Sequence, residues 1–142
     1  ADITVSTSGT DSDWIVKLID VYPGDAPDPD PNPKDVRMGD YQMLLAGEVF
    51  RAKFRNSYAK PEPMTPNKPT QIQFDLRDRY HTFLPGHRIM VQIQSSWFPV
   101  IDRNPQTFCD IYHAGEDAFQ SATQRVYRSA DAPSHIKLGV MP

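Results

Sequence analysis

The stretch from residue 88 to residue 107 constrains the possible folds most strongly. Ile89, Val91 and Ile93 alternate with mostly polar residues, and this period of two is typical of a half-buried β-strand. The alternation ends at Pro99, and a second proline follows within a polar cluster. Proline has no N–H to donate to a sheet ladder, so the strand must leave its sheet here. The sequence therefore predicts a strand followed by an ordered loop.

This loop contains a candidate recognition surface. Trp97 and Phe98 stand at its beginning, and Asp102, Arg103 and Asn104 follow. Because Trp, Phe and Arg are common interface anchors, one interpretation is a docking surface for another domain. The other is a structural corner, in which the rings enter the core and Arg103 bonds its own loop. Structural roles are the more common for such clusters, and both interpretations stay open.

Short strands are predicted along the rest of the chain. Residues 13–22 are apolar on both alternating faces, which favours a strand covered on both sides and central in its sheet. Residues 41–55 are long enough for a helix, but Gly47 and the sequence at 49–54 favour two strands separated by a bulge or bend. Further strands are expected at residues 1–8, 70–76, 108–112, 123–128 and 135–141, with a helical turn or polar loop at 115–122. Seven or eight short strands with irregular loops indicate an all-β sandwich.

Composition narrows the class further. Fourteen prolines among 142 residues disfavour long helices, and the length suits one domain. A net charge of −3 supports neither a nucleic-acid partner nor a polybasic membrane surface. No apolar run approaches the length of a membrane span. The single cysteine, Cys109, rules out an internal disulfide and is expected to be a buried, inert thiol.

The proline- and aspartate-rich segment after the second predicted strand begins like a calcium-binding loop. Asp28, Asp30 and Asn32 stand at alternate positions, as at the start of an EF-hand. However, Pro33 occupies the position that needs glycine, and Gly39 the position that needs glutamate. We therefore predict a solvated loop without a metal.

Catalytic residues are not predicted in this chain. A hydrolase serine normally sits in a G-x-S-x-G elbow between a strand and a helix, and no such pentapeptide occurs. His81 and His87 flank a predicted turn, but the spacing offers no third zinc ligand. Ordinary hydrogen bonds are expected for both histidines, and no cofactor is implied.

Carbohydrate binding is the alternative function. Four rings are candidate stacking surfaces for a sugar: Trp14, Trp97, Tyr112 and Tyr127. A free-standing carbohydrate-binding β-sandwich module is the corresponding alternative to a domain of a larger enzyme.

Several motifs together carry a family resemblance. They lie at residues 86–89, 95–99 and 102–107, with supporting matches at 13–23, 47–51 and 125–129. In this order they resemble the C-terminal β-sandwich domain of the cocaine-esterase and X-Pro dipeptidyl-peptidase hydrolases. The sequence is most similar to the branch that contains α-amino-acid ester hydrolases and glutaryl-cephalosporin acylases.

This resemblance implies a jelly-roll sandwich of the galactose-binding-like kind, with its first strand or two missing. Residues 1–142 would form a single C-terminal domain cut from a larger serine ester or amide hydrolase. Its catalytic Ser, Asp and His would belong to an upstream α/β-hydrolase domain, which is the implied partner. The domain itself would be non-catalytic and support enzyme structure or assembly, including a homo-oligomer.

Overall fold

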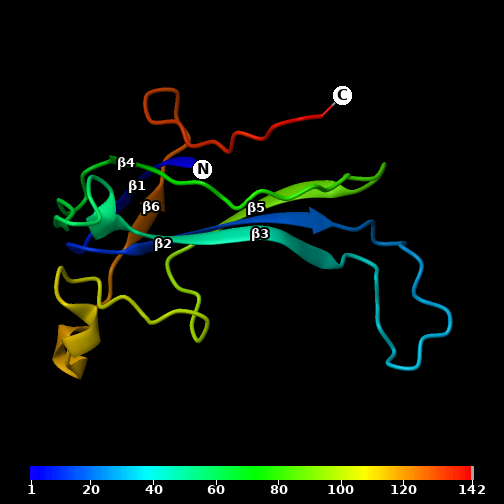
Figure 1. The fold of residues 1–142 in the computed structure, drawn as a ribbon, viewed down its shortest axis with the longest axis horizontal. Helices are drawn as coiled ribbons and strands as arrows, with labels where there is room; N and C mark the ends of the chain where they lie inside the picture. The colour runs from blue at the N-terminus through cyan, green and yellow to red at the C-terminus, as the bar shows by residue number, and fades with distance from the viewer. Residues whose placement is uncertain (142) are drawn as a thin grey trace. The chain divides into compact units, whose positions relative to one another are not determined.

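The computed structural model describes residues 1–141, which form six β-strands and three short 3₁₀-helices (Figure 1). In chain order these are β1 (Asp2–Thr7), β2 (Asp13–Val21), β3 (Gln42–Arg51), η1 (Ala52–Phe54), β4 (Thr70–Gln73), β5 (Arg88–Gln94), η2 (Ile111–His113), η3 (Glu116–Ala118) and β6 (Gln124–Val126). None of the helices in the described chain is long and apolar enough to cross a membrane.

The strands form two three-stranded sheets. One has the order β4-β1-β6, and the other has the order β3-β2-β5. In the first sheet β1 pairs antiparallel with both neighbours, with Ile3 opposite Ile72 and Val5 opposite Val126. Two antiparallel sheets and no α-helix in residues 1–141 confirm the all-β sandwich class predicted from the sequence.

Strand β2 is central in its sheet, as its sequence predicts. Eight of its nine residues are buried, and Lys17 is the exception. Trp14, Ile15 and Val16 are at most 1% exposed. Because both faces of the strand are covered, its sequence is apolar in both alternating positions rather than in one.

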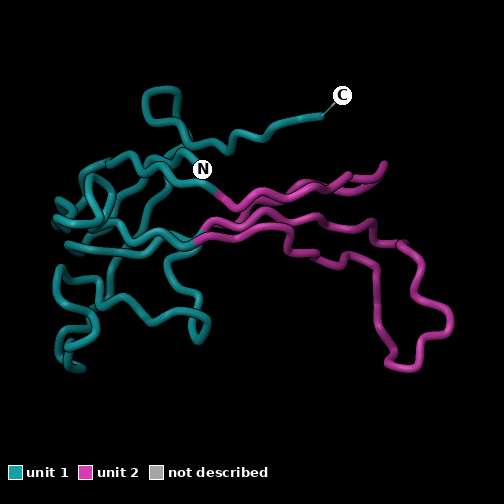
Figure 2. The backbone as a smooth tube through the Cα atoms, in the orientation of Figure 1, with its two compact units in different colours: residues 1–15, 49–75, 94–142 teal, residues 16–48, 76–93 magenta. Residues whose placement is uncertain are grey.

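The described chain divides into two compact units (Figure 2). The first comprises residues 1–15, 49–75 and 94 onward, and contains the sheet built on β1. Its core is aliphatic and aromatic, with Ile3, Val5, Trp14, Met64 and Ile72 buried. The second comprises residues 16–48 and 76–93.

Strand β3 runs without interruption through Gly47, so the predicted division of residues 41–55 is wrong. Glycine permits a bend but does not require one. The glycine with a positive φ angle among the described residues is instead Gly86, which lies in the turn before β5. The chain turns only after Arg51, where η1 begins.

Two predicted strands near the C-terminus are also wrong. Residues 108–112 enter η2 instead, because the Asp110 side chain accepts a hydrogen bond from the Tyr112 N–H and caps the turn. In residues 135–141 only His135 bridges to Asp2. Leu138 and Val140 are 48% and 90% exposed, so the alternating apolar set has no core against which to pack.

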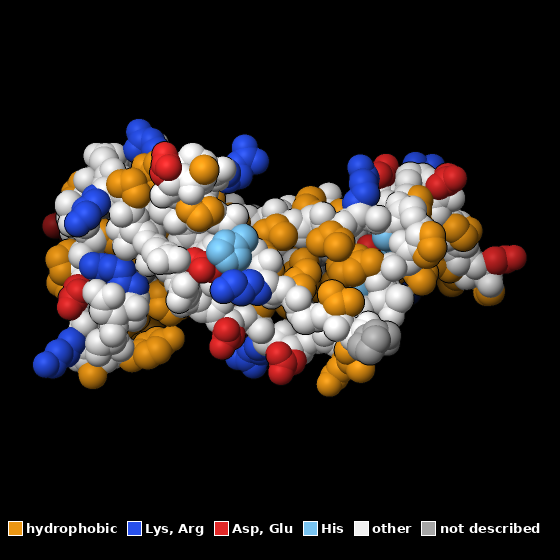
Figure 3. Space-filling view, turned by 90° about the horizontal axis from the view of Figure 1, so that it is seen from above, with side chains coloured by type: hydrophobic (Ala, Val, Ile, Leu, Met, Phe, Trp, Pro, Cys, Tyr) orange, Lys and Arg blue, Asp and Glu red, His pale blue; other side chains and the backbone are white. Residues whose placement is uncertain are grey.

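Strand β5 forms where it is predicted, but two of the three residues on its apolar face are exposed, and the third, Ile93, is half-buried. Ile89 is 57% exposed and Val91 is 42% exposed. Met90 and Gln92, which point to the opposite face of the strand, are half-buried. A period of two shows which residues share a face, not which face is covered. Figure 3 shows hydrophobic side chains at the molecular surface, interspersed with charged ones.

Candidate docking surface

The loop after β5 forms an exposed corner, which we call the docking corner and define as Trp97–Arg103 together with Phe119. The Ile101 N–H donates to the Trp97 carbonyl over 3.2 Å, which closes a turn. Phe98 and Val100 are each 65% exposed, while Trp97 is half-buried. The corner therefore presents apolar side chains outward from a hydrogen-bonded turn.

Arg103 lies between two aromatic rings of this corner. Its guanidinium carbon is 5.7 Å from the centroid of Phe98 and 5.3 Å from the centroid of Phe119. Both distances fall within the range of a cation–π interaction. These contacts link the loop after β5 to the segment that follows η3.

Asn104 faces the opposite way, into the domain. It is 6% exposed, and its amide nitrogen donates to Asp13 over 2.8 Å and to Asp11 over 3.2 Å. Its side-chain oxygen accepts from the Gln106 N–H at 2.8 Å. Asn104 thus satisfies two buried carboxylates with one side chain.

The electrostatics of this network depend on burial and pairing. Burial raises the pKa of Asp11, although the Asn104 hydrogen bond opposes that rise. Asp13 pairs with Arg51, whose Nε lies 2.9 Å from Oδ1. Burial disfavours the Arg51 charge, but the Asp13 hydrogen bond and negative charge outweigh it and raise the Arg51 pKa.

Backbone contacts fix the same loop from its other side. The Thr10 N–H donates to the Gln106 carbonyl over 3.0 Å, and the Gln120 N–H donates to the Pro105 carbonyl over 3.1 Å. Gly9 approaches the Gln106 carbonyl so closely that a Cβ at this position would collide with it. The end of the loop just after the corner is therefore anchored to the turn between β1 and β2 and to Gln120.

The five residues predicted as one surface accordingly divide into two groups. Phe98 and Arg103 come together at the surface, and Asp102 is exposed beside them. Trp97 is half-buried, and Asn104 belongs to the internal network. Each end of the loop therefore has one exposed residue, Phe98 or Arg103, beside one that is half-buried or buried, Trp97 or Asn104.

A polar cavity of about 360 Å³ adjoins Arg103. Its lining also includes serine and glutamine side chains, which can donate and accept hydrogen bonds. These residues are Ser95, Ser96, Gln106, Gln120 and Ser121. The cavity has room for one additional side chain.

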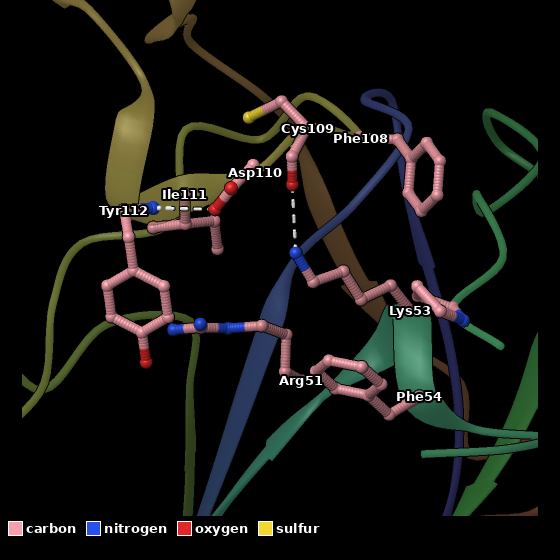
Figure 4. A pocket seen from close by; sticks show the side chains of 9 residues that line it. Arg51, Lys53, Phe54, Phe108, Cys109, Asp110, Ile111 and Tyr112 are labelled. Carbon is pink, nitrogen blue, oxygen red and sulfur yellow. Dashed lines mark hydrogen bonds between the residues drawn. The ribbon is translucent and has the colours of Figure 1, made fainter. Parts of the chain in front are cut away.

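A second cavity, of about 430 Å³, lies between η1 and η2 (Figure 4). The Lys53 ammonium donates to the Cys109 carbonyl over 2.9 Å, and Figure 4 shows Arg51 directed toward Tyr112. Phe54 and Phe108 add aromatic surface to this cavity. Cys109 is only half-buried, so the expectation of a buried thiol is wrong.

Sequence reasoning missed a cluster of two histidines around the buried Asp20 in the second unit. His81 Nε2 lies 2.8 Å from Asp20 Oδ2, and His87 Nδ1 lies 2.9 Å from Oδ1. Burial raises the pKa of Asp20, but hydrogen bonds from both histidines outweigh it, so the pKa is lowered overall. An acidic residue within an otherwise apolar strand was the available signal.

The acidic loop arranges its polar side chains around its own backbone. Asp28 Oδ1 accepts from the Met38 N–H at 2.7 Å, and Asn32 forms two 2.8 Å hydrogen bonds with Val36. Across residues 1–141, no three His, Cys, Asp or Glu side chains are arranged to hold a metal ion.

Comparison with known proteins places this geometry in a family. Residues 1–137 match the model of the X-Pro dipeptidyl-peptidase C-terminal non-catalytic domain. Cocaine esterase from Rhodococcus sp. (strain MB1 Bresler) is 32% identical over 141 residues, which are 99% of this chain and 22% of that protein.

Two solved structures are similar to this chain. A selenomethionine-labelled α-amino acid ester hydrolase is 47% identical, with a TM-score of 0.84 over 93% of this chain and 21% of its own. An aminopeptidase from the marine sediment archaeon Thaumarchaeota archaeon is 48% identical, with a TM-score of 0.85 over 94% and 21%. The chain therefore spans about a fifth of the length of these relatives. It belongs to the family of X-Pro dipeptidyl-peptidase C-terminal non-catalytic domains.

Proposed function

We propose that this chain is an accessory domain that packs on the catalytic α/β-hydrolase domain of a serine ester or amide hydrolase. The parent enzyme would be an acylase, an α-amino-acid ester hydrolase or an X-Pro dipeptidyl-peptidase. The accessory domain supplies no catalytic residue and supports the structure or assembly of the whole enzyme. Membership of a non-catalytic family and coverage of a fifth of each relative support this assignment.

The docking corner is the observation that carries the proposal. Phe98 and Val100 are each 65% exposed, although the loop that bears them is fixed by internal hydrogen bonds. Fully burying one such side chain stabilises an assembly by about 1.5–3 kcal/mol. A fixed loop also loses little conformational entropy on binding, so more of that energy remains as affinity.

The test uses the full-length polypeptide and the double substitution Phe98→Ser with Val100→Ser. Both side chains are exposed, so the 142-residue chain alone should change in unfolding free energy by only about 0.5 kcal/mol. In the full-length protein we expect the accessory domain to unfold at a lower temperature, separately from the hydrolase domain. Calorimetry of both proteins measures this difference.

Tyr112→Ser provides the matched control. Tyr112 is 78% exposed in the same unit but lies at the other cavity, outside the docking corner. It should leave unfolding of the full-length protein unchanged. Equal effects of the corner and control substitutions would contradict docking through this corner.

Carbohydrate binding retains one supporting observation. The exposed Tyr112 ring stands at a cavity with Phe54 and Phe108, which is suitable for stacking a sugar ring. By contrast, Trp14 is 1% exposed and cannot contact a ligand. Glycan-array binding that disappears in Tyr112→Ala would favour this second function.

A further inference from the structure

The Arg103 guanidinium is held in place without a hydrogen-bonding partner. The two rings of Phe98 and Phe119 position its charge, but rings do not occupy its N–H groups. Arg103 takes part in none of the ion pairs or side-chain hydrogen bonds found among residues 1–141. Its five donors are therefore available to a group outside this chain.

We propose that Arg103 binds a carboxylate side chain supplied by the hydrolase domain, in the cavity beside the docking corner. This inference rests on the proposed function and names the chemistry of one contact within it. The structure contributes three features to this site: an exposed cation, two rings that orient it, and an adjoining cavity of about 360 Å³.

Carboxylate is the anion that best fits these features. A guanidinium presents paired N–H donors that match the two oxygens of Asp or Glu, and such bidentate pairs are strong. The polar cavity lining, including Ser95 and Gln120, can satisfy oxygen lone pairs that Arg103 does not reach. An acidic side chain could therefore be buried there with its hydrogen-bonding groups satisfied.

The hydrolase domain is the partner to which we assign this carboxylate. The chain covers 21–22% of the relatives that it matches, so a much longer polypeptide surrounds the corresponding segment in those proteins. The exposed apolar residues Phe98 and Val100 adjoin Arg103 in the same loop. An interface that covers them would exclude water from the ion pair and strengthen it.

Zero-length cross-linking of the full-length Arg103→Lys variant tests the proposal. A carbodiimide condenses an amine with a carboxylate in direct contact, forming an amide while the reagent takes up the water and becomes a urea. The substitution keeps the positive charge and adds an amine where the carboxylate should lie. Peptide mass spectrometry then identifies the two joined residues. Arg128→Lys, at an exposed position in the same unit, places an equivalent amine elsewhere.

We expect a cross-link from position 103 to an Asp or Glu of the hydrolase domain. This cross-link should be absent from the unsubstituted full-length protein, which has no amine at position 103. Its yield should fall at least tenfold when Phe98→Ser is added to Arg103→Lys. Cross-links from position 103 only to acids of this chain, or none at all, would overturn the carboxylate contact. The calorimetric result for Phe98→Ser with Val100→Ser would still decide separately whether the corner docks.

Discussion

Asn104→Asp replaces one NH₂ group with an oxygen at the buried residue that follows the docking corner. In the unsubstituted protein, that NH₂ group donates to the carboxylates of Asp11 and Asp13. The variant would instead direct a third carboxyl group at them, while still accepting from the Gln106 N–H. The change preserves shape, so its effect on stability reports the hydrogen bonds and the charge.

The expected loss is large for this domain. Hydrogen bonds to charged groups contribute about 1.5–3 kcal/mol each, so losing two costs about 3–6 kcal/mol before coupling between them. Repulsion among the carboxylates is limited because the new group can take up a proton instead. Since domains are stable by about 5–15 kcal/mol, the variant should lie close to its unfolding threshold at pH 7.

The loss should also depend on pH. Burial and two neighbouring carboxylates would raise the folded-state pKa of the new group above its unfolded value. A group with a raised folded pKa contributes its stability below the unfolded pKa and loses it as the pH rises through the folded pKa. The deficit relative to the parent protein should therefore be smaller near pH 4 than at pH 7.

Urea denaturation of the 142-residue chain, followed by the fluorescence of its two tryptophans, Trp14 and Trp97, measures both effects. Asn56→Asp is the matched control, because the exposed Asn56 amide donates to Glu62 over 2.8 Å. It should cost only about 0–1 kcal/mol. Equal costs for the two substitutions, or a deficit at position 104 that does not shrink in acid, would refute the buried network.

Four further results are expected. Asp20→Asn leaves one histidine N–H without an acceptor and should lower the unfolding free energy by about 1–3 kcal/mol at pH 7, measured by urea denaturation. Because the folded-state pKa of Asp20 is lowered, this loss should shrink as the pH falls below the unfolded value of 3.8. A loss that stays constant with pH would argue against the cluster. Gly9→Ala should lower stability by about 1–3 kcal/mol, since the new Cβ meets the Gln106 carbonyl, and an unchanged urea midpoint would show that the loop is free to move. Millimolar calcium should leave the melting temperature unchanged. A specific site, with calcium at a hundred times its dissociation constant, would add about 2.7 kcal/mol of stability and raise the melting temperature by several degrees. The chain should not hydrolyse activated esters or label with a serine-reactive fluorophosphonate, and a labelled serine in residues 1–142 would contradict the accessory role.

The predictable parts of the fold are those in which the pattern of apolar residues matches the burial of each face of the strand. Strand β2 is apolar on both faces, and only a strand covered on both sides suits that pattern. Strand β4 was predicted from the alternation around Ile72, which is 1% exposed. By contrast, the turn at η2 depends on a single Asp110 cap, which outweighs the apolar character of Phe108 and Ile111.

The site was predictable in position but not in orientation. Residues 97–107 contain two rings, charges and prolines, and these identify an ordered corner. No local pattern indicates that Asn104 turns inward to carboxylates 91 and 93 residues away, because those contacts exist only in the folded chain. The Asp20 cluster was missed for the same reason, since its histidines lie 61 and 67 residues along the chain.

The mismatches between pattern and burial share a physical meaning. Ile89 and Val91 alternate as a buried face would, yet they are 57% and 42% exposed, and Val140 is 90% exposed. Ile89 and Val91 share one face of β5, and exposed apolar side chains that form a patch frequently mark an interaction surface. Under the proposed accessory role, a longer polypeptide would cover these residues. Their apolar alternation would then be explained by contacts made outside this chain. The same reasoning applies to Phe98 at the docking corner, where the exposed ring also positions a cation.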